Sequence, residues 1–289
     1  MIPISFDMET ADPDDVFTLC FLSSHPRVNL VSVTITPGSK HQVGLVKEVL
    51  HRLGRDDIPV GSKNKDHPKE CVSQFHYNWL GKIGPSEPDD VGCNILSSSL
   101  NKYPDLTIVC GASLGNIGAL LDLNIQLGRI VVQGGFAGDS VVPPEYRLDK
   151  FNGKETCPTF NLNGNVPSAL NVVATNLIKR KLFVSKNVCH GFIYDMPMHE
   201  RLKPYKDNYL GLSMLFNGME KYLKNTPTGK AFHDPLAACT AIDESICELK
   251  EVELYRLKGE WGSRLKENTN TFISINANRD KFEKTLFGI

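Results

Sequence analysis

The sequence predicts an α/β protein, a single domain over residues 1–289. Its expected architecture is a mostly parallel central sheet with helices on both faces and a small antiparallel edge near the C-terminus. Short apolar runs alternate with segments that carry apolar residues at helical spacing, a pattern typical of parallel sheets covered on both sides. No linker rich in Pro, Gly or Ser divides the chain. Near the C-terminus, Lys250–Leu257 and Thr271–Ile275 are expected strands without an intervening helix, which indicates the antiparallel edge.

The individual elements follow from hydrophobic periodicity and from residues that end helices and strands. Ile2–Asp7 is a short apolar run, and Asn29–Thr36 alternates apolar and polar residues as strands do. Val43–Leu53 has apolar residues at helical spacing and stops at Gly54. The other expected strands are Leu106–Cys110, Arg129–Val132 and Lys181–Ser185, and the other expected helices are Val16–Leu22, Leu114–Leu121, Pro167–Asn176, Leu210–Leu223 and Asp234–Ile242.

Three segments show no clear periodicity. Residues 61–94 and 136–165 are long and polar for a compact domain, which favours functional loops, and residues 195–230 are predicted as a less regular lid. Ligands of parallel sheets bind beyond the carboxyl ends of the strands. We therefore expect the chemistry in the loops that follow strands.

Composition and charge favour a small-molecule partner. The chain has 32 basic and 33 acidic residues and a formal net charge of -1, so it lacks the basic excess of a protein that binds nucleic acid. No segment has the length and apolar character of a membrane span, and no basic leader precedes an apolar run. The eight cysteines are scattered without metal-ligand spacing, which indicates buried thiols in a reducing compartment. We expect a cytoplasmic protein that contacts neither nucleic acid nor membrane.

An acidic segment, FDMETADPDD, follows the first expected strand. Its carboxylates are Asp7, Glu9, Asp12, Asp14 and Asp15. Such a cluster repels itself unless a positive charge lies among it, and oxygen ligands favour Ca²⁺ or Mg²⁺ over zinc. The plain alternative is a solvated turn whose last carboxylates cap the next helix. A haloacid dehalogenase-type phosphatase is disfavoured, because its D-x-D-x-T/V pattern fails at Glu9 and Ala11.

The acidic segment resembles the nucleoside hydrolase family, whose signature at the end of the first strand is D-x-D-P-G-x-D-D. Asp7 and Glu9 match its first two acids, and Asp14 and Asp15 match its closing pair. The chain departs from the signature twice: Glu replaces the second Asp, and one extra residue precedes the closing pair. The resemblance implies that Glu9 both ligates calcium and takes the proton from the attacking water. Asp12 is the alternative base.

Later segments resemble the family in the correct order, from residue 2 to about 242. They are VTITPGS (33–39), LTIVCGASLGNIGALL (106–121), IVVQGGFAG (130–138), TFNLNGNVPSA (159–169) and AFHDPLAACTAI (231–242). The resemblance implies a metal contact from the backbone carbonyl of Gly111 and a ribose contact from Asn161. Thr159 replaces a Glu that serves the 5′ side of the sugar, which leaves room for a different 5′ end. In the H-D-P segment, Asp234 would be the distal calcium ligand and His233 would face the base.

By this resemblance, the protein is a calcium-dependent N-glycosyl hydrolase of ribonucleosides that releases free base and ribose in purine or pyrimidine salvage. Glu9 and His233 would be catalytic, Asp14, Asn161 and Thr159 would contact the ribose, and the metal ligands would be Asp15, Asp234, Glu9, Gly111 and Asp7. The substrate is a nucleoside or a nucleotide, with a modified base or a 5′-phosphate left open. The family also suggests a homodimer or homotetramer.

A second hypothesis is a non-catalytic homologue that keeps the calcium and ribose contacts. Glu9, Thr159 and Asn165 favour it, because each replaces the residue that the family carries at that position.

Overall fold

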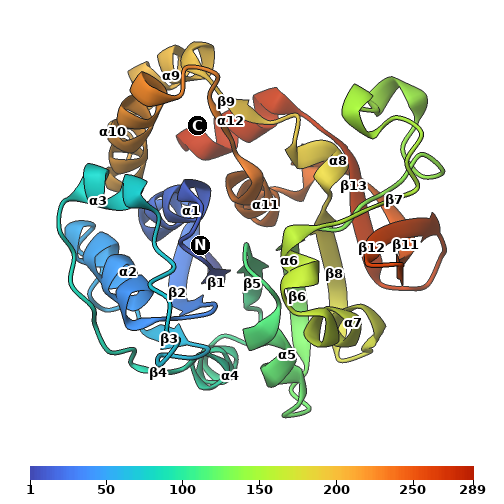
Figure 1. Ribbon diagram of the computed structural model, residues 1–289, viewed down its shortest axis with the longest axis horizontal. Helices are drawn as coiled ribbons and strands as arrows, with labels where there is room; N and C mark the ends of the chain where they lie inside the picture. The colour runs from blue at the N-terminus through green and yellow to red at the C-terminus, as the bar shows by residue number, and fades with distance from the viewer.

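The computed structural model describes residues 1–289, and eleven strands form one sheet in the order β4-β3-β2-β1-β5-β6-β8-β13-β11-β12-β7 (Figure 1). The strands from β4 to β13 in this order run parallel, and β11, β12 and β7 continue the sheet in antiparallel pairing. The bounds are β1 Ile2–Met8, β2 Val28–Ile35, β3 Val60–Ser62, β4 Asp90–Val91, β5 Thr107–Cys110, β6 Leu127–Gln133, β7 Thr156–Cys157, β8 Ile178–Val184, β11 Cys247–Leu257, β12 Glu260–Leu265 and β13 Thr271–Ala277. The predicted fold class and its antiparallel edge are confirmed.

Helices cover both faces of this sheet. In Figure 1, α1, α2 and α11 lie on the upper side of the parallel strands and α4, α5 and α7 on the lower side. The bounds are α1 Pro13–Ser24, α2 Lys40–Arg52, α3 Gln74–Leu80, α4 Gly92–Lys102, α5 Gly115–Leu121, α6 Phe160–Gly164, α7 Val166–Ala174, α8 Lys186–Cys189, α9 Met196–Leu202, α10 Leu210–Asn225, α11 His233–Ile242 and α12 Arg279–Phe287. Each face has its own apolar core, of 50 buried residues on the α1 side and 24 on the α5 side.

Strand β1 shows how the sequence separates these two cores. Side chains alternate between the faces of a strand, so Phe6 and its apolar neighbours pack into the larger core while Ser5 and Asp7 point to the other face. There the polar side chains pair across to β2: Ser5 Oγ lies 2.6 Å from Ser32 Oγ, and the Thr34 hydroxyl donates to Asp7 at 2.7 Å. A buried polar row therefore runs along β1 and β2.

Two of the three segments without clear periodicity are more regular than expected. Residues 61–94 contain α3, whose Trp79 packs against Phe17 of α1 with ring centroids 5.2 Å apart. Residues 195–230 hold α9 and the long helix α10. Helix α10 confirms the helix expected over Leu210–Leu223 and packs along α1, so the segment is not an irregular lid. Helix α3 was not expected from the sequence, because its buried face is formed by contacts with α1.

Two short strands lie outside the central sheet. Strands β9, Ile193–Tyr194, and β10, Lys230–Ala231, pair antiparallel directly before α11. This pairing ties the chain that enters α11 to the segment after α8, at the carboxyl edge of the sheet.

All eight cysteines are free thiols, and six of them are buried. Their burial agrees with the expectation from the sequence, while the cellular compartment stays a prediction. Among the helices, none combines the length and the apolar composition that crossing a membrane would need.

Candidate active site

A cavity of about 370 Å³ opens at the carboxyl ends of β1, β5 and β6. Its position agrees with the expectation that ligands of parallel sheets bind at this edge. The lining is strongly acidic and comes from five separate segments of the chain. The lining residues are Glu9, Ala11, Asp12, Asp14, Asp15, Gly111, Gln133, Phe160, Asn161, His233 and Asp234.

Three buried carboxylates meet at the floor of this cavity. Oxygen atoms of Asp14, Asp15 and Asp234 lie within 4.8 Å of one another, and the three residues are 1%, 1% and 5% exposed. Asp14 and Asp15 occupy the first turn of α1, and Asp234 occupies the first turn of α11. Both helices therefore direct the positive ends of their dipoles at the carboxylates, which stabilises their negative charge. The alternative of a solvated acidic turn does not fit, because these three carboxylates are buried.

Asp14 also fixes how α11 meets α1. Its Oδ2 accepts hydrogen bonds from the backbone N–H groups of His233, at 3.0 Å, and Asp234, at 3.3 Å. The first N–H groups of a helix have no partner within the helix, so a carboxylate from another helix supplies one here. Asp14 thus positions Asp234 through its backbone.

Lys230 is a site residue that the sequence reasoning missed. Its Nζ lies 2.7 Å from Oδ1 of Asp12 and 3.1 Å from Oδ1 of Asp14, and its side chain is only 8% exposed. Burial lowers the pKa of Lys230, but the carboxylates of Asp14 and Asp12 raise it by more, so the group stays charged. The preceding residue, Gly229, has φ of +90°, and a Cβ on it would lie 2.5 Å from the carbonyl oxygen of Tyr194. Only glycine therefore suits the turn that leads into Lys230. In the sequence, the pair Gly229-Lys230 just before the H-D-P segment could have indicated this residue.

The remaining charge of the cluster is not compensated by protein. Burial, and then the neighbouring carboxylates, raise the pKa values of Asp15 and Asp234 well above their ordinary range. Oδ1 of Asp234 is buried without a hydrogen-bond donor. A Cβ on Gly111 would lie 2.6 Å from that oxygen and 2.9 Å from Oδ1 of Asp15, so only glycine leaves this space open. An all-oxygen cradle with excess negative charge fits a hard divalent cation.

Glu9 and Asp12 have different surroundings in the same cavity. Burial, followed by the carboxylates of Asp12 and Asp14, raises the pKa of Glu9 to about 7, with no basic group among the causes. Asp12 instead pairs with Lys230. The backbone N–H of Glu9 donates to Oδ1 of Asp15 at 3.0 Å, which ties this residue to the cluster. Of the two residues left open as the base, Glu9 has the surroundings that suit a proton acceptor near neutral pH.

Asp7 is placed outside this cluster. It is fully buried in β1, and its carboxylate accepts from Thr34 at 2.7 Å and Asn116 at 2.8 Å, with Cys110 Sγ at 3.4 Å. Burial raises its pKa to about 6 in spite of these hydrogen bonds. The structure thus gives Asp7 a place in the polar row between β1, β2 and α5, and does not bring it to the predicted metal position.

The predicted ribose residues come from α6 and its N-terminus. Asn161 lines the cavity, and its amide donates to the carbonyl oxygens of Gly111, at 2.9 Å, and Gln133, at 3.0 Å. Thr159 is 3% exposed, and its buried hydroxyl has no partner. Between them, Phe160 is 75% exposed at the cavity wall. Asn161 therefore fixes the Gly111 carbonyl, and Phe160 is an apolar contact that the sequence reasoning did not single out.

His233 lines the side of the cavity next to a second histidine. The rings of His233 and His190 stack with centroids 4.8 Å apart and an angle of 26° between their planes. Burial and then Lys230 lower the pKa of His233 to about 4. The imidazole is therefore neutral near pH 7 and offers an N–H group, and its Nε2 has no partner within the protein.

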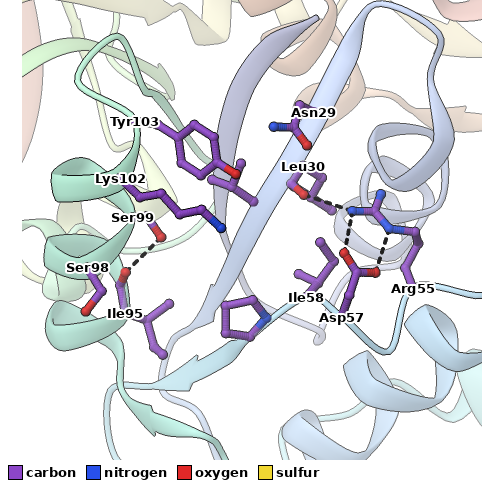
Figure 2. Close-up of a pocket in the computed structure, with 12 residues that line it drawn as sticks. Asn29, Leu30, Arg55, Asp57, Ile58, Ile95, Ser98, Ser99, Lys102 and Tyr103 are labelled. Atoms are coloured by element: carbon purple, nitrogen blue, oxygen red, sulfur yellow. Dashed lines mark hydrogen bonds and ion pairs between the residues drawn. The ribbon is translucent and has the colours of Figure 1, made fainter.

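A second cavity, of about 410 Å³, lies at the opposite, amino-terminal edge of β2 and β3 (Figure 2). Asp57 is the only acid that lines it, and Figure 2 shows it paired with Arg55, at 2.9 Å. Arg55 also donates to the carbonyl oxygen of Leu30. This cavity has no cluster of uncompensated groups, so the acidic cavity is the candidate active site.

Comparisons with known proteins agree with this fold. Residues 4–284 match the family described as inosine-uridine preferring nucleoside hydrolase. An uncharacterized protein of Aquifex aeolicus (strain VF5) is 26% identical over 294 residues, which are 97% of this chain and 96% of that protein. The pyrimidine-specific ribonucleoside hydrolase RihA of Shewanella sp. (strain MR-7) is 29% identical over 153 residues, 47% of this chain and 48% of that protein.

Solved structures share the fold over nearly the whole chain. A purine-preferring ribonucleoside hydrolase from Gardnerella vaginalis is 17% identical and has a TM-score of 0.71, with 99% of this chain and 97% of that chain covered. An inosine-uridine preferring nucleoside hydrolase from Bacillus anthracis is 15% identical and has a TM-score of 0.70, with 99% and 98% covered.

Proposed function

Because this chain belongs to the inosine-uridine preferring nucleoside hydrolase family, we propose that it hydrolyses the N-glycosidic bond of a ribonucleoside with a bound calcium ion. Membership makes the chain a ribonucleoside N-glycosyl hydrolase. The calcium ion, the substrate and the role of each residue belong to the proposal.

The observation that carries the proposal is the convergence of Asp14, Asp15 and Asp234 at the helix N-termini beside Gly111. Asp15, Asp234, Glu9 and the Gly111 carbonyl would hold the ion, and carboxylate and carbonyl oxygens are the ligands that calcium prefers. A bound calcium ion would orient the vicinal hydroxyls of the ribose and a water molecule, and would make that water more acidic. Asp7 is left out of the proposed ligand set, because Thr34 and Asn116 occupy its carboxylate.

Glu9 takes the proton from the attacking water in this proposal. The water oxygen bonds to the anomeric carbon, the N-glycosidic bond breaks, and the bonding electrons leave with the base. Positive charge builds on the ribosyl ring, as in other glycoside hydrolyses. Asp14 accepts hydrogen bonds from the ribose hydroxyls through the lone pairs that Lys230 and the α11 backbone leave free, and the surrounding carboxylates favour the positive ring.

His233 serves the leaving base. Its neutral ring offers an N–H to the departing nitrogen or to a water beside it, so the negative charge that develops there gains a hydrogen bond. Asn161 holds the Gly111 carbonyl in place and borders the sugar, and the exposed Phe160 ring provides an apolar wall.

Two residues favour a second candidate, a calcium- and ribose-binding protein without turnover. Lys230 neutralises part of the acidic cluster, and Thr159 supplies a hydroxyl where the family has a carboxylate. Lys230 offsets negative charge, and Thr159 supplies none, which disfavours a cationic transition state.

Assaying released ribose and free base over a panel of purine and pyrimidine nucleosides and nucleotides separates the two candidates. Each reaction is run with calcium and with a chelator, with Asp234→Asn as the inactive control. We expect calcium-dependent release that the control lacks. Calcium and nucleoside binding without any release of base would instead establish the non-catalytic candidate.

We further propose a homodimer or homotetramer that acts in cytoplasmic purine or pyrimidine salvage. The support is the family, together with eight free thiols, which suit a reducing compartment. Sedimentation equilibrium of the purified protein tests the assembly, and a monomer at micromolar concentration would contradict it.

A further inference from the structure

Two lysines and a histidine surround the ring of Phe151 beside the active-site cavity. We name Lys150, Lys186 and His190 the basic shelf. The Nζ atoms of Lys150 and Lys186 lie 5.2 Å and 5.9 Å from the ring centroid, and the His190 ring lies 5.4 Å from it, edge to face. Phe151 is itself 5% exposed and packs against Phe136, so the ring is a fixed support.

The basic shelf is continuous with the cavity on two sides. His190 stacks on His233, which lines the cavity. Lys186 Nζ donates to the carbonyl oxygen of Pro158 at 2.9 Å, one residue before the segment 159–161 that forms the wall of the cavity. The shelf thus extends the site beyond the leaving-group residue and the sugar wall.

The charge of the shelf is not neutralised by the protein. Lys150 Nζ makes its polar contact with Nδ1 of His190, at 2.7 Å, and Lys186 makes its own with a neutral carbonyl. Neither lysine takes part in any of the salt bridges of the chain. The carboxylate cluster of Asp14, Asp15 and Asp234 lies within the cavity itself. A positively charged group of side chains therefore adjoins a cavity whose own lining is acidic.

This charge favours an anion over a cation. Cys189 Sγ and ring nitrogens of His190 and His233 lie within 4.8 Å of one another, as ligands of a soft metal ion would. Burial lowers the pKa of His190, and the nearby positive charges of Lys150, Lys186 and Lys230 lower it further in the same direction, to about 3. These positive charges would repel a metal ion.

We propose that the basic shelf binds an anionic group carried by the ribonucleoside substrate, a phosphate monoester on the 5′ carbon of the sugar. The inference rests on the proposed function, because the acidic end must hold the ribose for the other end of the substrate to reach the shelf. Lysine ammonium groups are point-charge ligands for phosphate oxygens. An acidic group on the base would meet the shelf by the same chemistry.

Steady-state kinetics with three substrates test the proposal and separate the two positions of the anion. The substrates are uridine, uridine 5′-monophosphate and orotidine, which has a carboxylate on its base and no phosphate. The variants are Lys150→Gln and Lys186→Gln, with Lys154→Gln as the matched control, because Lys154 lies on the same exposed loop and makes no side-chain contact with the shelf. We expect kcat/KM to favour the 5′-monophosphate over uridine. Each shelf variant should lower that ratio by about tenfold or more, since hydrogen bonds to charged groups are strong. The control should keep the ratio within about twofold.

If the protein prefers orotidine and both shelf variants reduce that preference, the shelf is still an anion site, but the anion that it binds is on the base and not on the 5′ carbon. Equal or better hydrolysis of uridine, with a ratio that no variant changes, would overturn the shelf while leaving the proposed function intact. If none of the three pyrimidine substrates is cleaved, the panel of purine and pyrimidine nucleosides decides the proposed function, and calorimetry with ribose 5-phosphate against ribose tests the shelf. Equal affinities of the two sugars for the wild-type protein would then overturn it, and tighter binding of the phosphate that both shelf variants weaken would support it.

Discussion

Lys230 Nζ lies 3.1 Å from Oδ1 of Asp14 and joins the segment before α11 to the first turn of α1. Both side chains are nearly inaccessible to solvent, at 8% and 2% exposure. The other oxygen of Asp14 accepts from the backbone of α11. Asp14, in the first turn of α1, therefore links the N-termini of α1 and α11, which carry the predicted metal ligands.

Replacing Lys230 with Met tests this connection. The substitution leaves Asp12 and Asp14 without a counter-charge, and breaking a buried ion pair costs about 3–5 kcal/mol. We expect the free energy of unfolding, measured with urea in the presence of a chelator, to fall by about that amount, and saturating calcium to restore part of it. Lys266→Met, which removes an exposed partner of Glu253, is the control and should cost far less. Equal losses in the two variants would mean that Lys230 does not hold the site together.

Glu9→Gln should abolish proton abstraction without removing the ribose contacts. We expect kcat to fall by roughly 100- to 10,000-fold, the usual contribution of a general base. Asp12→Asn should have a smaller effect on kcat, because Asp12 is paired with Lys230. The measurement is kcat at saturating nucleoside, with metal content determined in parallel. A larger loss in Asp12→Asn, with calcium retained, would transfer the role of the base to Asp12.

Metal binding should distinguish Asp234 from Asp7. Asp234→Asn and Asp15→Asn should lose calcium, measured by atomic emission after dialysis, together with activity. Asp7→Ala should keep calcium but lose about 1–3 kcal/mol of stability, because the donors of Thr34 and Asn116 lose their buried acceptor. Loss of calcium in a folded Asp7 variant would return Asp7 to the ligand set. Full calcium occupancy in either of the other variants would remove that residue from it.

The stabilisation by calcium should depend on pH in a defined direction. The pKa of Glu9 is raised from 4.5 to about 7, and those of Asp15 and Asp234 are raised well above 3.8. In the metal-free protein, groups with raised pKa values bind more protons when folded than when unfolded, so their contribution to stability is lost as the pH rises to about 7. Calcium requires the deprotonated carboxylates and so replaces these protons.

The difference in Tm between calcium-loaded and chelated protein should therefore be small near pH 5 and should increase through about pH 7. The buried histidines have lowered pKa values and change the stability with pH in the opposite direction. They do so with and without calcium, so their contribution largely cancels in this difference. A difference that stays constant over this range would contradict the carboxylate assignment.

His233→Ala should affect substrates according to their leaving groups. Natural nucleosides have poor leaving groups and should lose most of their turnover, whereas nitrophenyl riboside should lose much less, because its leaving group needs no hydrogen-bond donor. The measurement is kcat for both substrates, with His51→Ala, a surface histidine, as the control. Equal losses on both substrates would remove His233 from leaving-group stabilisation.

Much of the fold follows from local patterns. Strands such as β1 and β2 and helices such as α2 and α11 have apolar spacing and end signals that their own residues supply, and they were predicted to within a few residues. Helix α10 was likewise predicted, over Leu210–Leu223. Helix α3 was not, because its Phe75 and Trp79 pack against Phe17 of α1, far away in the sequence. Strand β12, between the two predicted edge strands, was also missed.

The sequence by itself determined that Asp14, Asp15 and Asp234 stand at the starts of two helices after an acidic loop and in an H-D-P segment. A residue type, its neighbours and a helix start are local properties, so they can be read along the chain. Only the tertiary structure decided which acids meet and which are already paired. Asp7 and Glu9 differ by two positions, yet Thr34 and Asn116 surround the first, while the second faces the cavity.

The same reason explains Lys230 and the basic shelf. The charge on a lysine is visible in the sequence, but its effect falls off with distance in space. Lys230 reaches Asp14, and Lys150 reaches His190, only because packing brings together segments that are far apart in the chain.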